Sequence, residues 1–459
     1  MKISVIGAGY VGLTTAACLS QIGHDVFCSE SDLDKLTKLQ NGVMPLFEPH
    51  LEEVTSAARK ANRLRFGSTE EAIDWGLAIF ICVGTPPLAN GSPDLSAIET
   101  VARAIAKRAC GYRLIVEKST VPVQTGSQLR RHLAVHSTRK QDYDVASNPE
   151  FLREGTSVED FLHPDRIVVG VESSRAADVL REIYGPIIDQ KITCPIHAEC
   201  PRRNPPRFLV TDTNSSELIK HASNSFLAMK ISFINMVSDL CEAAGADISQ
   251  VAEGIGLDPR IGSSFLQPGI GFGGFCFPKD LQAFVRIAEK FGCDFTLLKE
   301  VERINQSRVD LLVEKIQKEL WVLRGKKICI WGVAFKPNTD DIRFAPALSI
   351  IRRLQAEGAH IQAYDPKAME KAKKEIPNIT YCQDAYEAAN GADAVVLLTE
   401  WEEFRKMDWC RLATLVERPL IIDGRNALPL DDLTRNGFEY VGIGRLSALP
   451  RLEPAMITV

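Results

Sequence analysis

The sequence lacks any hydrophobic run long enough to cross a membrane. Its longest apolar runs, LAIFICVG (77–84) and ADAVVLL (392–398), fall well short of the about 18–20 residues that a membrane-spanning helix needs. A surplus of positive charge is also absent, because 54 Lys and Arg residues stand against 59 Asp and Glu residues and form no long basic run. We therefore expect neither a membrane protein nor a nucleic-acid-binding protein.

The twelve cysteines lack the paired spacing of a disulfide framework. They are scattered singly, and some, such as Cys18 and Cys82, lie inside apolar runs. Reduced cysteines in a cytoplasmic protein explain this pattern best, and the first residues form a strand pattern rather than a signal peptide. One close pair, Cys194 and Cys200, flanks His197 in a Pro/Arg-rich loop. That spacing matches no standard zinc motif, so we expect no bound metal.

A chain of 459 residues is too long for one ordinary core, and we expect two or three domains. Short β-branched runs alternate with helical stretches over residues 1–190 and again from Lys326, whereas residues 211–306 have a helical pattern. Such alternation is typical of βαβ units and parallel sheets. The sequence therefore predicts an α/β fold with two Rossmann-like lobes joined by a long central helical segment. The expected domains are 1–200, 201–305 and 306–459, with junctions near 195–207 and 305–325.

The same patterns predict individual elements. Strands are expected at 2–7, 25–30, 77–84, 113–120, 143–149 and 166–172, and in the later segments KKICIWGVA, HIQAYDP, ADAVVLLTEW and PLIIDGRN. A long periodic helix is expected at 215–245, closed by Gly245. A second helix is expected at 277–292, with Pro278 in its first turn.

The hexapeptide GAGYVG (7–12) follows the first expected strand and opens a helix. Gly7 permits a tight turn, Gly9 allows close approach of a pyrophosphate, and Gly12 allows close packing of helix and strand. Glu30 ends the second expected strand, where a carboxylate accepts hydrogen bonds from ribose hydroxyls and repels a 2′-phosphate; the next basic residue is Lys35. The pattern predicts an NAD site, although Glu30 alone could also be a solvated residue at a strand end.

Two residues of the long central helix lie on one face, because Lys220 and Asn224 are four positions apart. A solvated lysine on the rim of a helix is one interpretation. If the face lines a cleft instead, the ammonium and the amide together could stabilise an oxyanion.

The stretch GIGFGGFCFPKDL (269–281) places four glycines before Cys276. Cys276 falls at a helix N-terminus, where the helix dipole and Lys279 favour the thiolate. Asp280, one turn later, could act on a proton or on a water molecule. An inert cysteine beside a flexible loop is the alternative. A nucleophilic cysteine close to NAD would hold an aldehyde as a thiohemiacetal and then an acyl group as a thioester.

Several motifs in order resemble the UDP-glucose/GDP-mannose dehydrogenase family over nearly the entire chain. They are GAGYVG (7–12), CVGTPP (82–87), EKSTVPV (117–123), SNPEFLREGT (147–156), HPDRIVVG (163–170), ELIKHASNSFLAMKISFIN (217–235), GFGGFCFPKD (271–280), FKPNTDDIR (335–343), TEW (399–401) and DGRN (423–426). The resemblance implies two successive NAD-dependent oxidations at C6 of a nucleotide sugar, with UDP-glucose converted to UDP-glucuronate.

The resemblance also implies residue roles. Cys276 would be the nucleophile, Lys220 and Asn224 would stabilise the oxyanion, Asp280 and Thr120 would position water, and Glu150 would assist thioester hydrolysis. The implied cofactor contacts are Gly7, Gly9, Tyr10, Val11, Gly12, Glu30, Lys35, Thr85, Thr120, Glu154, Lys279 and Arg343. The implied substrate contacts are Glu150, Phe151, Leu152, Arg153, Glu154, Lys220, Asn224, Arg260, Phe265, Leu266, Gln267, Pro268, Gly269, Gly273, Lys336 and Arg425.

Quaternary structure is implied in the same way. Arg260 resembles an arginine that reaches the substrate of a neighbouring subunit, so the central helices would form the interface of a homodimer or of a higher homo-oligomer.

The second lobe lacks GxGxxG, and its basic residues Lys336 and Arg343 suit a nucleotide diphosphate better than a dinucleotide.

Four positions depart from the family pattern. Phe275 stands where a small residue, commonly Ser, is usual; His50 and Gln124 stand where Gly is usual; and Glu30 replaces the commoner Asp. The loop 191–209 is also longer and richer in Pro and Arg than is typical. Phe275 leaves the identity of the sugar open, with GDP-mannose or a UDP-N-acetylhexosamine as alternatives. A single-step dehydrogenase of the 6-phosphogluconate type and a silent NAD/UDP-sugar-binding protein are further alternatives.

Overall fold

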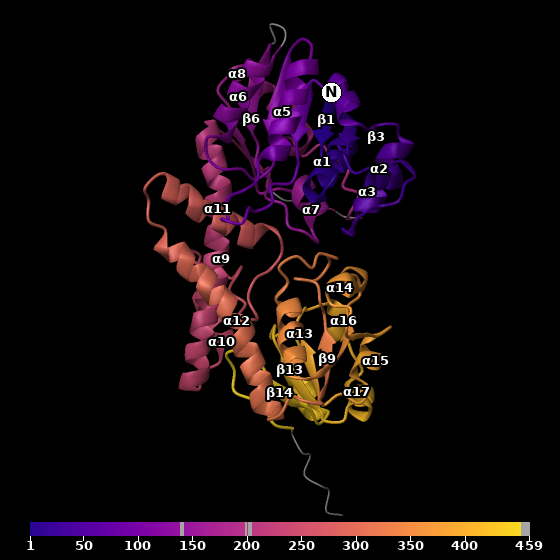
Figure 1. Ribbon diagram of the computed structural model, residues 1–459, viewed down its shortest axis with the longest axis vertical. Coiled ribbons are helices and arrows are strands. Elements are labelled where there is room, and N and C mark those ends of the chain that lie inside the picture. Colours follow the sequence, from indigo (N-terminus) through magenta and orange to yellow (C-terminus); the bar gives the residue numbers. More distant parts are fainter. Residues whose placement is uncertain (138–141, 198–199, 201–203, 451–459) are drawn as a thin grey trace, which may run out of the picture. The chain divides into compact units, whose positions relative to one another are not determined.

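The computed structural model describes residues 1–137, 142–197, 200 and 204–450. The chain divides into two compact units. The first comprises Met1–Ser223 and Gln282–Cys293, and the second comprises Asn224–Leu281 and the residues from Asp294 onward. Two helices, α9 (Thr213–Ala244) and α11 (Cys276–Lys290), contribute residues to both units. Figure 1 shows the elements coloured along the sequence.

The first unit contains an eight-stranded sheet in the order β3-β2-β1-β4-β5-β6-β7-β8. Neighbouring strands are parallel except β6 and β7, which pair antiparallel. The first six positions have the strand order of a Rossmann fold. The strands are β1 (Lys2–Ile6), β2 (Asp25–Ser29), β3 (Leu64–Gly67), β4 (Ala78–Ile81), β5 (Arg113–Glu117), β6 (Tyr143–Ser147), β7 (Arg166–Gly170) and β8 (Arg207–Thr211).

Helices cover both faces of this sheet, so its central strands are apolar on both sides. In β4, Ala78 and Phe80 belong to one buried cluster, while Ile79 and Ile81 belong to the cluster on the opposite face. The helices of this unit, besides parts of α9 and α11, are α1 (Tyr10–Gln21), α2 (Leu33–Gln40), α3 (Leu51–Lys60), α4 (Thr69–Trp75), α5 (Ser96–Arg108), α6 (Thr125–His136), α7 (Ser157–Leu162) and α8 (Ser174–Ile188).

The second unit contains a six-stranded parallel sheet in the order β11-β10-β9-β12-β13-β14. Its strands are β9 (Lys327–Trp331), β10 (His360–Tyr364), β11 (Thr380–Tyr381), β12 (Ala394–Leu397), β13 (Leu420–Asp423) and β14 (Glu439–Val441). Its helices, besides parts of α9 and α11, are α10 (Ile248–Gly256), α12 (Thr296–Leu320), α13 (Pro346–Ala356), α14 (Met369–Glu375), α15 (Ala385–Ala389), α16 (Glu402–Arg405), α17 (Trp409–Leu415) and α18 (Leu430–Arg435). The prediction of two Rossmann-like lobes with a central helical segment is confirmed.

Four strands were not predicted, namely β3, β8, β11 and β14. Each of them lies at an edge of its sheet. An edge strand has a neighbour on one side only and needs less apolar surface, so its sequence resembles that of a loop. The burial of β8, which is nowhere complete, illustrates this difference from the fully buried β4.

The long helix was predicted closely. It ends at Ala244, and Gly245 follows with a φ of +74°, which is the left-handed conformation that ends many helices. Helix α12 continues through residue 306 as far as Leu320, so the expected second junction consists largely of helix. The domain boundaries at 200 and 305 stay a prediction.

Two of the residues that depart from the expected family pattern have an unusual backbone conformation. His50 and Gln124, which replace glycines of the resemblance, both have left-handed backbones, with φ values of +64° and +77°. Each is the residue just before a helix, α3 and α6 respectively. A glycine adopts this conformation without the steric cost that a side chain brings.

Among the residues that the structure describes, no helix combines the length and the apolar character needed to cross a membrane. All twelve cysteines lie in the described ranges, and none is in a disulfide. Several, including Cys28 and Cys329, are fully buried.

Candidate active site

The glycines of GAGYVG differ in what surrounds them. A Cβ on Gly7 would lie 2.7 Å from the carbonyl oxygen of Cys82, and a Cβ on Gly12 would lie 1.8 Å from the carbonyl oxygen of Gly7. At Gly9, by contrast, no atom lies within 4 Å of the Cβ position. Gly7 and Gly12 are therefore required by packing within the protein, and Gly9 leaves open space at the start of α1, where a pyrophosphate fits.

Glu30 follows β2 and lies against this glycine loop. Its Oε2 accepts a hydrogen bond from the backbone N of Ala8 at 3.3 Å, and its Oε1 accepts from the backbone N of Ser31 at 2.8 Å and of Asp32 at 3.0 Å. These bonds fix the carboxylate at the end of β2, beside the open space at Gly9. The residues present thus fit the adenosine half of NAD.

The other expected cofactor residues of the first unit lie on different elements. Tyr10 and Val11 form the partly exposed first turn of α1, and Lys35 is exposed on α2. Thr85 is buried, and its hydroxyl donates to the backbone oxygen of Thr120 at 3.0 Å. This bond joins the loops that follow β4 and β5.

A buried ion pair connects the segment after β6 with α9. Lys220 Nζ lies 2.8 Å from Glu150 Oε1, and each side chain is 5% exposed. Glu150 Oε2 also accepts from the backbone N of Leu152 at 2.6 Å, while Lys220 Nζ lies 5.5 Å from the ring centroid of Phe151. Two expected catalytic residues are therefore in direct contact, and each compensates the charge of the other.

Lys118 was not singled out from the sequence, although it belongs to the EKST motif. It is buried, and its Nζ donates to the backbone oxygen and to Oδ1 of Asn148 at 3.4 and 3.3 Å. Burial lowers the pKa of Lys118 to about 8, and the nearby Glu150 acts in the opposite direction. Lysines with lowered pKa values are concentrated at functional sites, so Lys118 joins the candidates.

The second unit holds the cysteine. Cys276 is the first residue of α11 and is partly exposed. One turn on, buried Asp280 accepts from Lys279 Nζ at 2.6 Å and from Asn224 Nδ2 at 2.7 Å. The predicted pair of Lys220 and Asn224 is thus divided between partners: Lys220 is bonded to Glu150 and Asn224 to Asp280.

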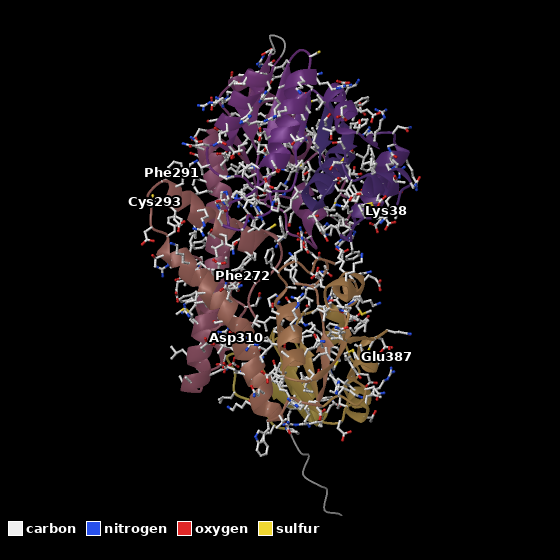
Figure 2. All side chains as sticks on the ribbon, viewed as in Figure 1. Lys38, Phe272, Phe291, Cys293, Asp310 and Glu387 are labelled. Atoms are coloured by element: carbon white, nitrogen blue, oxygen red, sulfur yellow. The ribbon has the colours of Figure 1, made fainter. Side chains whose placement is uncertain are left out.

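The glycines before Cys276 have a structural role that the sequence did not suggest. A Cβ on Gly273 would lie 2.4 Å from the backbone oxygen of Phe344, and one on Gly274 would lie 2.7 Å from the ring of Phe335. Asn305 clamps the loop, because its side chain bonds both the backbone N and O of Phe272 at 2.8 and 2.9 Å (Figure 2 labels Phe272). The glycines allow the loop to pack against protein, and a sugar contact at Gly269 or Gly273 stays a prediction.

Phe275 packs between two cations. The guanidinium carbon of Arg343 lies 4.4 Å from its ring centroid, and Lys279 Nζ lies 5.6 Å away. Arg343 also makes a two-pronged ion pair with Asp341. The ring therefore contacts two expected cofactor residues.

The remaining expected substrate residues differ in their exposure and in the contacts that they make. Arg425 donates to the backbone oxygens of Leu398, Gly271 and Phe335 at 2.9, 3.0 and 3.2 Å, so its guanidinium ties the cysteine loop to the ends of β9 and β12. Arg260 is 88% exposed and paired with Asp258. The others are Phe151, Leu152, Arg153 and Glu154 between β6 and α7, Phe265, Leu266, Gln267 and Pro268 between α10 and α11, and Lys336 after β9.

A Rossmann sheet with an open glycine at the start of α1 and a fixed carboxylate at the end of β2 defines a dinucleotide-binding protein. Sequence models of the UDP-glucose/GDP-mannose dehydrogenase family match the chain in three places: the NAD binding domain at residues 1–188, the central domain at 214–307 and the UDP binding domain at 329–430. The chain belongs to this family and is an NAD-dependent oxidoreductase.

Individual relatives agree over nearly full length. A UDP-glucose 6-dehydrogenase of Rhizobium meliloti (strain 1021) is 43% identical over 450 residues, which cover 97% of this chain and 100% of the relative. The UDP-glucose 6-dehydrogenase YwqF of Bacillus subtilis (strain 168) is 44% identical over 455 residues, covering 98% and 99%. A solved UDP-glucose dehydrogenase from Pyrobaculum islandicum is 36% identical with a TM-score of 0.86, covering 97% of this chain and 98% of its own.

Proposed function

We propose that this enzyme oxidises UDP-glucose at C6 to UDP-glucuronate in two NAD-dependent steps. The observation that carries the proposal is the position of Cys276 at the start of α11, with Asp280 bonded to Lys279 and Asn224 one turn later. An alcohol dehydrogenase that stops at the aldehyde needs no thiol. The family membership and the names of the full-length relatives support UDP-glucose as the substrate.

The chemistry is divided among the named side chains. NAD, when bound, accepts the hydride of each oxidation. Cys276 Sγ adds to the aldehyde carbon and holds it as a thiohemiacetal, and it then holds the acyl group as a thioester. Water cleaves the thioester, which releases the carboxylic acid and returns the thiol.

Charge and protons are handled by five side chains, of which all but Thr120 are buried. Lys220 and Asn224 stabilise the oxyanion, Asp280 and Thr120 position the water, and Glu150 assists its attack on the thioester. Glu150 is suited to this task because Lys220 and the backbone N of Leu152 fix both of its oxygens.

We also propose that the enzyme is a homodimer or a higher homo-oligomer. Phe226, Phe233 and Leu240 of α9 are seven residues apart, and they are 58%, 54% and 68% exposed. A spacing of seven places them on one stripe of the helix. A second copy of the stripe would remove this apolar surface from water.

A cytoplasmic location is part of the proposal, because Cys276 must remain a reduced thiol.

The decisive experiment measures NADH released per UDP-glucose consumed. We expect two NADH per sugar for the wild type, and Cys276→Ser should stall at or before the thioester stage. Cys293→Ser, a substitution at an exposed cysteine just after α11 (Figure 2), is the matched control and should behave as wild type.

Three outcomes would contradict the proposal. A ratio of one NADH per sugar would indicate a single oxidation. Complete oxidation by Cys276→Ser at the wild-type rate would remove the thioester mechanism. No turnover of UDP-glucose, in a panel that includes GDP-mannose and UDP-N-acetylhexosamines, would remove the assigned substrate.

A further inference from the structure

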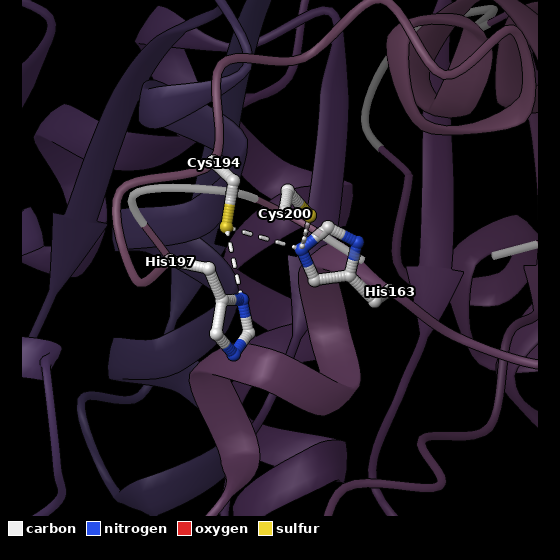
Figure 3. Close-up of side chains that lie close together, drawn as sticks. All are labelled: His163, Cys194, His197 and Cys200. Atoms are coloured by element: carbon white, nitrogen blue, oxygen red, sulfur yellow. Dashed lines mark hydrogen bonds between the residues drawn. The ribbon is translucent and has the colours of Figure 1, made fainter. Parts of the chain in front are cut away.

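Four potential metal ligands converge on the first unit, in the loop that the sequence analysis left without a role. They are His163, which follows α7, and Cys194, His197 and Cys200 from the loop between α8 and β8. One donor atom of each residue lies within 4.8 Å of the donor atoms of the other three. Figure 3 shows both imidazoles and both sulfurs pointing toward one centre. In the described part of the chain, no other group of His, Cys, Asp or Glu donors satisfies the same test.

Three of the six distances between the donor atoms are close to the edge lengths of a zinc tetrahedron. His163 Nε2 lies 3.3 Å from Cys194 Sγ and 3.4 Å from Cys200 Sγ, and Cys194 Sγ lies 3.4 Å from His197 Nδ1. Around a tetrahedral zinc ion, with bonds of about 2.3 Å to sulfur and about 2.0–2.1 Å to nitrogen, a sulfur and a nitrogen lie about 3.6 Å apart. These three distances differ from that value by only a few tenths of an ångström, and all the other donor-to-donor distances are within 4.8 Å.

Direct hydrogen bonds explain the cluster less well than a shared cation does. His163 Nε2 is within reach of two sulfurs at once, yet one ring nitrogen carries a single proton or a single lone pair. Thiols are also weak hydrogen-bonding groups. A cation at the centre would satisfy all four atoms together, because each directs a lone pair toward it.

We propose that His163, Cys194, His197 and Cys200 bind a structural zinc ion. Two thiolates and two imidazoles are a ligand set that zinc prefers, and two thiolates balance its charge. Four protein ligands leave no open coordination position, so the ion stabilises the fold and takes no part in the oxidation.

The position of the cluster indicates what the ion would hold. The loop connects α8 with the edge strand β8, and Ile192 and Ile196 already pack against the buried core of this unit. Zinc would link that loop to the turn between α7 and β7. His163, which lies in this turn, precedes Cys194 by 31 residues. Since α7 directly follows the segment 150–156, the ion would also brace residues expected to contact substrate and cofactor.

The first test measures metal in the purified full-length protein, prepared with reductant and zinc and then freed of loosely bound metal. Mass spectrometry of the elements should find one zinc per chain in the wild type. Cys194→Ser and His197→Asn should lose most of it. Cys110→Ser and His132→Asn, which change a cysteine and a histidine outside the cluster, should keep it.

The second test uses the wild type alone, so it does not depend on the folding of any variant. Replacing zinc by Co²⁺ should give a thiolate-to-cobalt charge-transfer band and the visible bands of tetrahedral cobalt. A strong chelator should abolish the bands and lower the melting temperature, whereas Cys194→Ser should melt at one temperature with or without chelator.

Any of three results would overturn the proposal. The first is a wild-type protein that carries no zinc and shows no cobalt charge-transfer band. The second is a Cys194–Cys200 disulfide that forms in preference to metal binding when zinc is present under reducing conditions. Equal zinc content in the wild type and in Cys194→Ser and His197→Asn would show that the metal is held elsewhere and would also overturn it.

Discussion

The guanidinium of Arg343 stacks on the ring of Phe275, with its central carbon 4.4 Å from the ring centroid. The resemblance described above predicts a small residue at position 275, and a small side chain could not make this contact. Arg343 is also paired with Asp341. The stacked ring therefore limits where an expected cofactor-binding arginine can move.

Phe275→Leu should raise the KM for NAD. An exposed cation–π contact contributes about 0.5–1 kcal/mol, so we expect an increase of about two- to fivefold with little change in kcat. Steady-state kinetics with NAD varied at saturating UDP-glucose measures it. Phe275→Tyr, which keeps an aromatic ring, is the control. An unchanged KM for NAD in the leucine variant, or a large change in the KM for the sugar alone, would contradict a role through Arg343.

Asp280→Asn should lower kcat by about two to four orders of magnitude, as expected when a general acid or base is lost. The amide keeps the size of the side chain but cannot take up a proton. The pH profile of kcat should lose the limb that Asp280 supplies. Asn224→Ala, which removes the donor 2.7 Å from Asp280, should lower kcat by about two to three orders of magnitude. Variants with kcat within twofold of wild type would remove these residues from the chemistry.

Glu117 should make stability depend on pH. Burial raises the pKa of this carboxyl from its ordinary value of 4.5 to about 8. Between these values the unfolded chain releases the proton and the folded protein keeps it, so the free energy of unfolding should fall as pH rises, by at most about 1.4 kcal/mol per unit. Below pH 4.5 and above pH 8 the effect should vanish.

Glu117→Gln tests this dependence, because the amide has the size of the carboxyl and no charge to lose. Melting temperatures recorded from pH 5 to pH 8 should fall less steeply in the variant than in wild type. Glu99→Gln, a change at an exposed ion pair, should leave the slope as it is. Parallel curves for wild type and Glu117→Gln would show that Glu117 does not titrate in this range.

His50→Gly and Gln124→Gly should each stabilise the protein by about 1 kcal/mol. Both residues are exposed and have left-handed backbones, which cost a residue with a side chain roughly 1–2 kcal/mol, while glycine loses more chain entropy on folding. Thermal unfolding should show higher melting temperatures that add in the double variant. Glu53→Gly, an exposed change within helix α3, should have the opposite sign.

Phe233→Glu should weaken self-association, because it places a charge in the exposed apolar stripe of α9. Analytical ultracentrifugation over a range of concentrations should show a shift toward monomer. Val135→Glu, which changes an exposed apolar residue of α6 in the first unit, should leave the distribution unaltered. Equal association of both variants would place the interface elsewhere.

Local sequence patterns predicted those structural elements whose characteristic residues all lie within one segment. The central strands, the long helix with Gly245 after it, and the glycine loop with Glu30 all depend on residues close in sequence or on a fixed spacing. The edge strands were missed because a half-exposed strand needs no apolar run. The cysteine was placed correctly at a helix N-terminus, because Pro278 and the periodicity after it mark the start of α11.

Contacts between residues far apart in the sequence could not be predicted from the spacing of motifs. The sequence placed Lys220 and Asn224 on one helix face, but only the fold shows that Glu150, 70 residues away, neutralises Lys220. The protein neighbours of the glycines before Cys276 were also out of reach of local patterns. Phe335 and Phe344, which lie against Gly274 and Gly273, come from segments that no local pattern connects to them.

The loop 191–209 shows the division most clearly. By itself the sequence determined that two cysteines and a histidine lie close together along the chain, and it determined the Rossmann lobes and the NAD fingerprint; it also singled out Cys276 as the candidate nucleophile. Only the tertiary structure brings His163 to Cys194 and Cys200, because β7 and α8 lie between them in the sequence and separate them by 31 and 37 positions. Periodicity and short spacings are properties of neighbouring residues, whereas a four-ligand centre depends on how distant segments pack.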